Sequence, residues 1–304
     1  MSTESNVKPG SGRVAEVLPV SADKTSPPTD SGSGRDMGIG NDLQLQMERT
    51  DMEPRVYKKR WVMLAMFISL SASNGAQWIM YSVIAQIVAD FYGVSFAAVD
   101  WTSMIYMATY IALFIPAAYL LDKYGLRLSL LLGATGNAVG AWIRMFSTNP
   151  DGFWITFVGQ SIVGASQMFT LGIPPRLAAV WFGPNEVSTA CAAGVFGNQL
   201  GIAAGFLVPP LIVRNGTQEE VSTRLTYLFL SSALLNTAIF ALIVCFFSAR
   251  PPTPPSLAQI TAQEEKTLDS NFWRTLTKLM LSKNFILLFI TYGRSFSDSF
   301  FKEL

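Results

Sequence analysis

The chain has 304 residues, of which 50% are hydrophobic and only 14% are charged, and its formal net charge is +1. With a mean hydropathy of +0.33, this composition is too apolar for an ordinary soluble domain, so we expect an integral, multi-pass protein of the lipid bilayer. The near-neutral charge gives no basic surface for nucleic acid, and the sequence has no histidine, the commonest metal ligand and general base.

The first 56 residues form a polar tail. They are rich in Ser, Gly, Pro, Asp and Glu and have no periodic apolar positions, so residues 1–56 are predicted to be disordered. The tail lacks a charged segment followed by an apolar run and a small-residue cleavage site. We therefore expect the first apolar run to direct insertion into the membrane.

Residues 57–248 predict a six-helix transmembrane bundle. They contain six apolar runs, and each is near the roughly 20 residues that a spanning helix needs. The connections between the runs are mostly short. The predicted spans are Trp61–Val88, Ala98–Leu121, Leu128–Phe146, Phe153–Phe182, Val187–Val213 and Leu225–Phe247.

Basic residues predict how the bundle is oriented. Lys58, Lys59 and Arg60 precede the first span, and most other basic residues fall on the same side when the spans alternate. By the positive-inside rule this side, with the N-terminus, is cytoplasmic. The sequon Asn215-Gly216-Thr217 then lies in an extracellular connection, so Asn215 is the expected glycosylation site of a plasma-membrane protein.

Residues 249–283 are predicted to form a cytoplasmic linker that ends in an amphipathic helix. The linker begins with a proline cluster. In its last part, Phe272, Trp273 and Leu276 lie on one helix face, and Arg274 and Lys278 lie outside that face. Such a helix suits the headgroup layer, although packing on neighbouring protein is an alternative. The last apolar run is too short to cross a bilayer, so residues 284–304 are predicted to be the truncated start of a second lobe, with a truncated seventh helix.

Polar and aromatic residues near the middle of the first span suggest a solute pathway. Asn74, Gln77, Trp78 and Tyr81 stand at i, i+3, i+4 and i+7, so they share one helix face. Polar side chains are costly at this depth unless they face a partner helix or a watery cavity. The alternative for Trp78 is that it only fills the core of the bundle.

Two later spans add polar and small residues at helical spacing. Gln167 lies near the midpoint of the fourth span and predicts either a substrate contact or an interhelical hydrogen bond. In the fifth span Gly197, Gly201 and Gly205 recur every four residues, which is typical of helices that pack closely.

The connection between the second and third spans contains a recognisable loop. Asp122, Lys123, Gly125 and Arg127 match in kind the cytoplasmic signature of the major facilitator superfamily, Gly-x-Leu-Ala-Asp-Arg-x-Gly-Arg. Ala118 replaces its leading glycine, and Leu126 shifts the arginine by one position. The resemblance implies an all-α fold in which this chain supplies the N-terminal six-helix bundle.

Longer strings narrow the resemblance to one family of that superfamily. Over about residues 57–293 the chain resembles the feline leukaemia virus subgroup C receptor family, whose members have twelve spans and are described as choline and ethanolamine transporters. The resemblance implies that Trp78 and Gln167 bind substrate, with Asn74 and Met107 as weaker candidates. The strings are Gln77–Ile79, Phe91–Ser95, Asp100–Trp101, Asp122–Arg127, Trp181–Gly183, Asn185–Cys191 and Phe196–Ile202.

Three functions therefore stay open at this point. Facilitated transport of choline or ethanolamine is preferred, since an aromatic ring can hold a quaternary ammonium. Haem export is the first alternative, although the chain has no histidine to ligate iron. The second is a membrane fragment that transports nothing and acts as a receptor or a dominant negative. Because no paired acids, activated nucleophile or metal cluster are visible, we expect no enzyme activity, catalytic residue, metal or cofactor.

Overall fold

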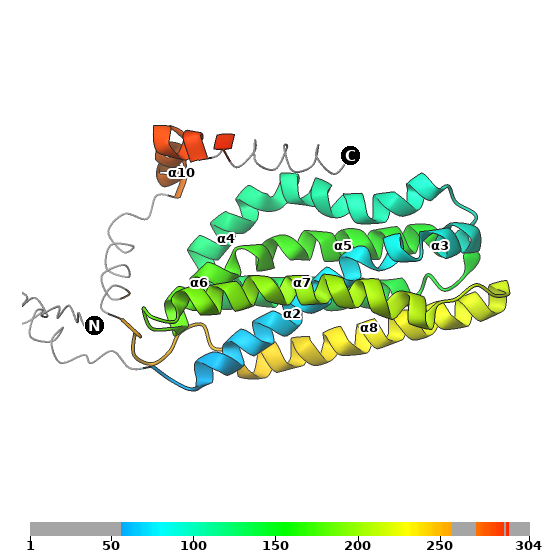
Figure 1. Ribbon diagram of the computed structural model, residues 1–304, viewed down its shortest axis with the longest axis horizontal. Coiled ribbons are helices and arrows are strands. Elements are labelled where there is room, and N and C mark those ends of the chain that lie inside the picture. The colour runs from blue at the N-terminus through cyan, green and yellow to red at the C-terminus, as the bar shows by residue number, and fades with distance from the viewer. Residues whose placement is uncertain (1–55, 257–258, 260–271, 289, 292–304) are drawn as a thin grey trace, which may run out of the picture. The chain divides into compact units, whose positions relative to one another are not determined.

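The computed structural model describes residues 56–256, 259, 272–288 and 290–291, and regular structure within them is helical (Figure 1). Predictions for the tail before residue 56, for residues 260–271 and for the chain after residue 291 lie outside the described part. Four of the described helices are long and apolar enough to cross a membrane: α2, α4, α7 and α8.

The first predicted span consists of two helices. Helix α2 covers Lys59–Val83 and α3 covers Ala85–Tyr92. They are separated by Ile84, whose φ of −114° and ψ of 28° leave the helical region and whose amide donates to Tyr81 O. Gly93 ends α3 at φ 63°, a left-handed cap that glycine adopts without a steric penalty.

The second and third spans are the two arms of α4, Phe96–Met145. The chain turns sharply at Gly125, where φ is 83° and ψ is −175°, a conformation almost restricted to glycine. The Ser95 side chain caps the beginning of α4 by accepting from the Ala98 amide. A glycine in the signature loop therefore produces the turn between the two spans.

The fourth span is likewise divided. After the short 3-10 helix η1 (Pro150–Gly152), α5 covers Phe153–Leu171 and α6 covers Ile173–Trp181. Pro174 lies in the first turn of α6, where the missing amide hydrogen costs nothing. Pro174 and its neighbour Pro175 thus coincide with the end of one helix and the beginning of the next.

The remaining helices follow the predicted order. Helix α7 covers Val187–Ile212, and α8 covers Gln218–Phe246. A capping box, in which Thr217 and Glu220 exchange side-chain and backbone hydrogen bonds, begins α8. Helix α10 covers Phe272–Met280, where the sequence predicts an amphipathic helix, and Phe272 lies 5.4 Å from the ring of Tyr119 in α4.

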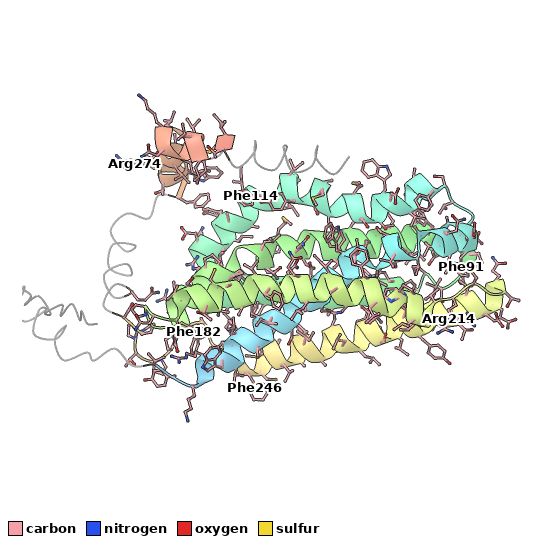
Figure 2. All side chains as sticks on the ribbon, viewed as in Figure 1. Phe91, Phe114, Phe182, Arg214, Phe246 and Arg274 are labelled. Atoms are coloured by element: carbon pink, nitrogen blue, oxygen red, sulfur yellow. The ribbon has the colours of Figure 1, made fainter. Side chains whose placement is uncertain are left out.

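The bundle has two ends, which we name by their residues. The basic end holds Lys58, Lys59, Arg60, Lys123 and Arg127, and the sequon end holds Asn215. Phe182 and Phe246 mark the basic end in Figure 2, and Phe91 and Arg214 mark the sequon end.

The interior has two apolar clusters, one towards each end. The cluster near the basic end is built around Phe67, Leu130, Leu177, Trp181 and Ile243. The cluster near the sequon end is built around Tyr81, Val88, Val99, Leu225 and Phe229. Buried polar side chains from α2, α4 and α5 accompany these clusters in the interior.

Candidate functional site

A buried arginine joins α2, α4 and α5. The Arg144 side chain is 0% exposed, and its Nη1 donates to Gln160 Oε1 at 3.1 Å and to Met80 Sδ at 3.0 Å. Its Nη2 donates to Gln77 Oε1. Gln160 in turn donates through Nε2 to the backbone carbonyl of Gln77 at 2.8 Å. These bonds fix the orientation of α2 at the residue that precedes Trp78.

A second set of polar contacts lies beside Arg144. Asn74 Nδ2 donates to Asn137 Oδ1 at 2.8 Å and to Val163 O at 3.3 Å. Ser166 Oγ donates to the same Asn137 oxygen at 3.0 Å. We call this set, together with Gln77, Arg144 and Gln160, the polar seam. Its hydrogen bonds join α2, the second arm of α4 and α5 to one another.

The predicted stripe on the first span is therefore divided between two environments. Asn74 and Gln77 are buried within the polar seam. Tyr81 is 0% exposed and belongs to the apolar cluster at the sequon end, with its ring 6.1 Å from that of Phe229. Three of the four stripe residues thus pack between helices, and only Trp78 is partly exposed.

Ser103 on the first arm of α4 holds Trp78 at two points. The indole Nε1 donates to Ser103 O at 3.3 Å, and Ser103 Oγ donates to Trp78 O at 3.2 Å. Ser82 Oγ lies 2.7 Å from Ser103 Oγ, so it can donate to the serine while the serine donates to Trp78. Because the indole N–H already has a partner, the ring offers a ligand its π face and no hydrogen-bond donor.

Gln167 and Met107 also have accessible side chains. Gln167 is half-buried, and its amide makes no hydrogen bond with the described part of the chain. Met107 is 54% exposed on the first arm of α4. These two residues and Trp78 are the predicted substrate contacts that the structure leaves open to a ligand.

The register of α2 and α5 relates Trp78 to Gln167. The helices run antiparallel here, because Asn74 bonds Val163 and Gln77 bonds Gln160. Asn74 and Val163 lie at the same level. Trp78 is one turn from that level in one direction, and Gln167 is one turn from it in the other. The two residues are therefore separated by about 12 Å along the helix axes. Helical side chains lean towards the N-terminus of their own helix, so these two lean towards each other and shorten that gap.

The signature loop is held by contacts at the basic end. Asp122 Oδ1 lies 3.8 Å from Arg176 Nη1 on α6, and Arg176 also donates to the carbonyl of Leu121. The Lys123 ammonium lies 5.4 Å from the ring of Tyr119, and hydrogen bonding to Tyr119 raises the pKa of Lys123. Arg127 is exposed.

The three glycines of α7 face α2 at close range. A Cβ on Gly201 would overlap the backbone carbonyl of Ala72, and one on Gly197 would lie 3.0 Å from Ile68 Cγ2. A Cβ on Gly205 would lie 2.8 Å from Ala76 O. Only glycine permits the two helix backbones to lie this close.

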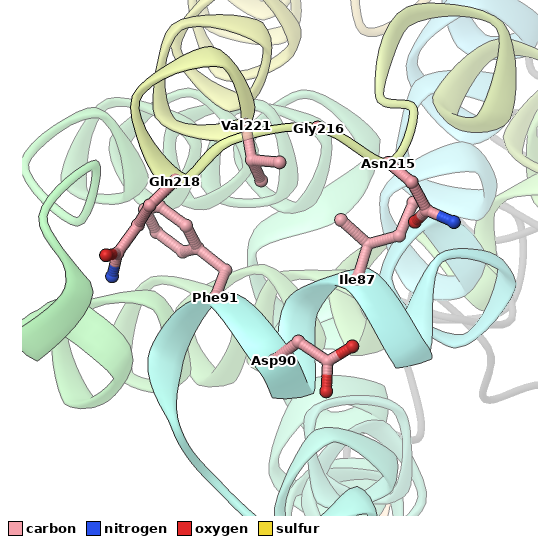
Figure 3. A pocket seen from close by; sticks show the side chains of 7 residues that line it. All are labelled: Ile87, Asp90, Phe91, Asn215, Gly216, Gln218 and Val221. Atoms are coloured by element: carbon pink, nitrogen blue, oxygen red, sulfur yellow. The ribbon is translucent and has the colours of Figure 1, made fainter.

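Figure 3 shows a groove at the sequon end, between α3 and the beginning of α8. The groove has a volume of about 380 Å³. Asn215 is exposed at its rim. The groove is lined by Ile87, Asp90, Phe91, Asn215, Gly216, Gln218 and Val221.

A smaller hollow of about 210 Å³ lies among α2, α7 and α8. Its lining is mainly apolar, but Gln77 and Ser73 of α2 contribute polar atoms. Gln77 therefore contacts Arg144 on one side and borders this hollow on the other. Among the described residues, no cluster of acidic, histidine or cysteine side chains could hold a metal ion.

Sequence reasoning missed Arg144, a charged side chain that is 0% exposed. Its signal is present in the sequence, because it stands inside the third predicted span, two residues before the end at Phe146. A cation within a membrane span is a functional candidate by default. Its partner Gln160 also stands inside an apolar run, and nothing in the sequence indicated that the two residues are neighbours.

Comparison with known proteins gives a family match and several relatives. A family model described as Major Facilitator Superfamily matches residues 64–301. An uncharacterized MFS-type transporter of Caenorhabditis elegans is 70% identical over 82% of this chain and 43% of its own length. The choline/ethanolamine transporter flvcr2b of Danio rerio is 46% identical over 83% of this chain and 52% of its own length.

The human relative gives a similar result. The choline/ethanolamine transporter FLVCR2 of Homo sapiens is 44% identical over 79% of this chain and 46% of its own length. The chain thus spans about half the length of the curated relatives it matches.

Proposed function

Because the chain belongs to the major facilitator superfamily, we propose that it forms the N-terminal lobe of a transporter that carries choline and ethanolamine down their gradients. The relatives named above are called choline/ethanolamine transporters, which favours these substrates over haem. The structural observation that carries the proposal is the partly exposed side chain of Trp78, whose N–H is already bonded to Ser103 O.

A quaternary ammonium suits such a ring. It cannot donate a hydrogen bond, so a protein recognises it with aromatic faces, each worth about 0.5 to 2 kcal/mol. An indole whose N–H is occupied presents the face and nothing that competes with it. Trp78 is therefore assigned the quaternary ammonium of choline. The primary ammonium of ethanolamine can lie over the same ring face, but it also carries hydrogen-bond donors that the ring does not satisfy.

Gln167 suits the other end of these molecules. Both substrates carry a hydroxyl, and an unpaired amide can both accept from it and donate to it. The side chains of Trp78 and Gln167 lean towards each other along the two helices, so a small molecule that contacts both is part of the proposal. Met107 is assigned an apolar contact beside the ring, whereas Asn74, Gln77 and Tyr81 are assigned to support α2 from behind.

The position of the acidic residues supports transport without proton coupling in this lobe. Within the described helices the acidic side chains, such as Asp90, Asp122 and Glu186, lie at helix ends. A proton relay in a membrane commonly uses carboxylates at depth. We therefore assign the driving force to the gradient of the substrate itself.

The membrane topology is proposed from the charges and the sequon. The protein is a multi-pass membrane protein, and we place its basic end in the cytoplasm and Asn215 outside the cell, at the plasma membrane. Treatment of the expressed protein with peptide N-glycosidase F should lower its apparent mass, and Asn215→Gln should abolish that shift. A glycosylated protein that is unchanged by Asn215→Gln would contradict the assignment.

Uptake of labelled choline by cells that express the protein tests the substrate site. We expect Trp78→Ala to lower uptake at least tenfold, whereas Trp78→Phe retains part of it because a smaller aromatic face remains. Trp154→Ala is the matched control, since Trp154 is 71% exposed and lies at the beginning of α5, where membrane proteins place aromatic residues.

Two outcomes contradict the proposal. Unchanged uptake by Trp78→Ala, at equal surface expression, would remove the ring from the site. A wild-type chain that takes up no more choline than untransfected cells would favour the alternative of a membrane fragment without transport activity.

A further inference from the structure

The chain leaves the bundle beside the point where it enters. Tyr57, which precedes α2, places its hydroxyl 3.0 Å from Thr253 Oγ1, in the segment that follows α8. Lys59 Nζ donates to Ser248 Oγ at 2.9 Å, and the Ser248 amide donates to Met63 Sδ at 3.3 Å. Two segments that lie up to 196 residues apart in the sequence are therefore in contact at the basic end.

Thr253 stands in an extended, proline-rich segment. Two prolines precede it and two follow it, in the string Pro251–Pro255, and the chain forms no helix from residue 247 to residue 256. Proline fixes its own φ and restricts the residue before it to extended conformations. Such a segment has few conformations to lose when it binds in an extended groove. The Thr253 side chain is partly exposed, and its hydroxyl contacts that of Tyr57.

A hydroxyl followed directly by proline is the acceptor that one class of protein kinases requires. These proline-directed kinases bind their substrate segment in an extended conformation, and many of them also favour a proline two residues before the acceptor. Thr253 meets both conditions, with Pro254 after it and Pro251 two positions before it. The other serine or threonine of this chain that proline follows is Ser26, which has Lys24 in place of the earlier proline.

Positive charge at the basic end is available to a phosphate on Thr253. Lys58 and Lys59 directly follow the tyrosine that contacts Thr253, and within the described residues neither lysine belongs to an ion pair. Helix α2 begins here without an acidic residue in its first turn. Arg250, three residues before Thr253, is exposed and close enough to Arg176 for the two charges to interact. A phosphate carries about −1.5 to −2 charges at neutral pH and would be attracted to these cations.

We propose that Thr253 is phosphorylated by a proline-directed kinase and that its phosphate then pairs with Lys58 and Lys59. The kinase transfers the γ-phosphoryl group of ATP: a bond forms between the γ-phosphorus and Thr253 Oγ1, and the bond to the bridging oxygen breaks. ADP leaves, and the hydroxyl proton passes to the catalytic aspartate of the kinase. The ion pairs join the segment after α8 to the beginning of α2. Such a kinase reaches Thr253 if the basic end faces the cytoplasm, as proposed above, whatever the transported substrate is.

Phosphorylation of the purified full chain in detergent, by a mitogen-activated protein kinase with ATP, tests the site. Mass spectrometry of the digested chain should find phosphate on Thr253. Thr253→Ala should abolish this signal, Pro254→Ala should lower the initial rate at least tenfold, and Thr253→Ser should retain it. Ser256→Ala is the matched control, because Ser256 lies in the same segment but is followed by leucine.

The contact with Tyr57 gives a second measurement. Thr253 must detach from Tyr57 before its hydroxyl can react, so Tyr57→Phe, which preserves the ring and removes the bond, should raise the initial rate about three- to tenfold. Tyr124→Phe is the control, because Tyr124 is 54% exposed at the same end and is not the partner of Thr253.

The pairing of the phosphate is measured by limited proteolysis. Trypsin must draw a lysine side chain into its specificity pocket, and an ion pair holds that side chain back. Phosphorylation of Thr253 should therefore slow cleavage after Lys58 and Lys59 at least twofold. Thr253→Ala, treated with the same kinase, should be cleaved as fast as the untreated chain.

Three results would overturn the proposal. Absence of phosphate on Thr253, under conditions in which a peptide substrate of the kinase is fully modified, would remove the site. Unchanged cleavage after Lys58 and Lys59 would remove the pairing. In growing cells, an unmodified Thr253 on chains that carry a glycan at Asn215 would show that a correctly oriented protein is not a substrate, whereas absence of the glycan would contradict the proposed topology instead.

Discussion

The two sides of α2 bind their neighbours by opposite means. On the side that faces α7, Ala72 and Ala76 lie against Gly201 and Gly205, and the backbones are close enough to exclude any side chain. On the side that faces α4 and α5, the polar seam joins the helices through amide and guanidinium hydrogen bonds. The first interface is formed by close backbone packing, and the second contains a charged side chain.

The difference shows how a helix can be held in lipid without a hydrophobic driving force. Lipid tails are as apolar as leucine, so membrane helices associate through close van der Waals packing and through interhelical hydrogen bonds. The glycine side consists mainly of van der Waals contact area, to which Asn198 of α7 adds a hydrogen bond from its Nδ2 to Ser71 O of α2 at 3.3 Å. The polar side fixes one register and one rotation. Trp78 directly follows Gln77 of the polar seam, so the hydrogen bonds of the seam also restrict the position of Trp78.

The largest effect is expected on the glycine side. Gly201→Ala places a methyl group against the carbonyl of Ala72, so the two backbones must separate, and the free energy of unfolding should fall by about 3 kcal/mol. Equilibrium unfolding in mixed micelles measures this change.

A control glycine shows whether the overlap is responsible. A Cβ on Gly183 would meet only Val56 Cγ2 at 3.6 Å, an ordinary contact, so Gly183→Ala should change stability by about 0.5 kcal/mol or less. Equal losses in the two variants would show that close approach to α2 is not what makes Gly201 necessary.

A smaller effect is expected from a single bond of the polar seam. The pair Asn74 and Asn137 shares one side-chain hydrogen bond of 2.8 Å, and a double-mutant cycle with alanine isolates its energy. Cycles of this kind in membrane helices average about 0.6 kcal/mol and reach about 1.7. We expect a value near the upper figure, because both residues are buried. A coupling energy of zero would show that the seam is held by its charge rather than by its amides.

Much of the fold could be predicted from the sequence because the lengths of apolar runs report directly on bilayer spans. The six predicted spans correspond to α2 with α3, the two arms of α4, α5 with α6, α7 and α8, and the resemblance to the major facilitator superfamily is confirmed. The break at Ile84 was not predicted, because neither glycine nor proline stands there. A turn near Gly125 could be predicted from the sequence, because this glycine lies in the signature loop between two predicted spans.

The candidate site was harder to predict. Helical spacing places Asn74, Gln77, Trp78 and Tyr81 on one face, but it cannot tell which side of that face meets another helix. That depends on residues of other helices, such as Asn137, Gln160 and Phe229. They are far from α2 in the sequence, so helical spacing cannot predict that they pack against it. The substrate contacts assigned to Trp78, Gln167 and Met107 stay predictions that uptake experiments decide.

The smallest effect is expected at the edge of the bundle, where a bond resembles those of the seam but is not buried. Trp142 Nε1 donates to Thr237 Oγ1 at 2.8 Å, joining α4 to α8, and Trp142 is 40% exposed. Thr237→Val preserves the shape of the side chain and removes the acceptor, so unfolding should become easier by about 0.5 kcal/mol. If this loss equalled that of the Asn74 and Asn137 pair, burial would not be what distinguishes the seam, and its strength would follow from the number of its bonds alone.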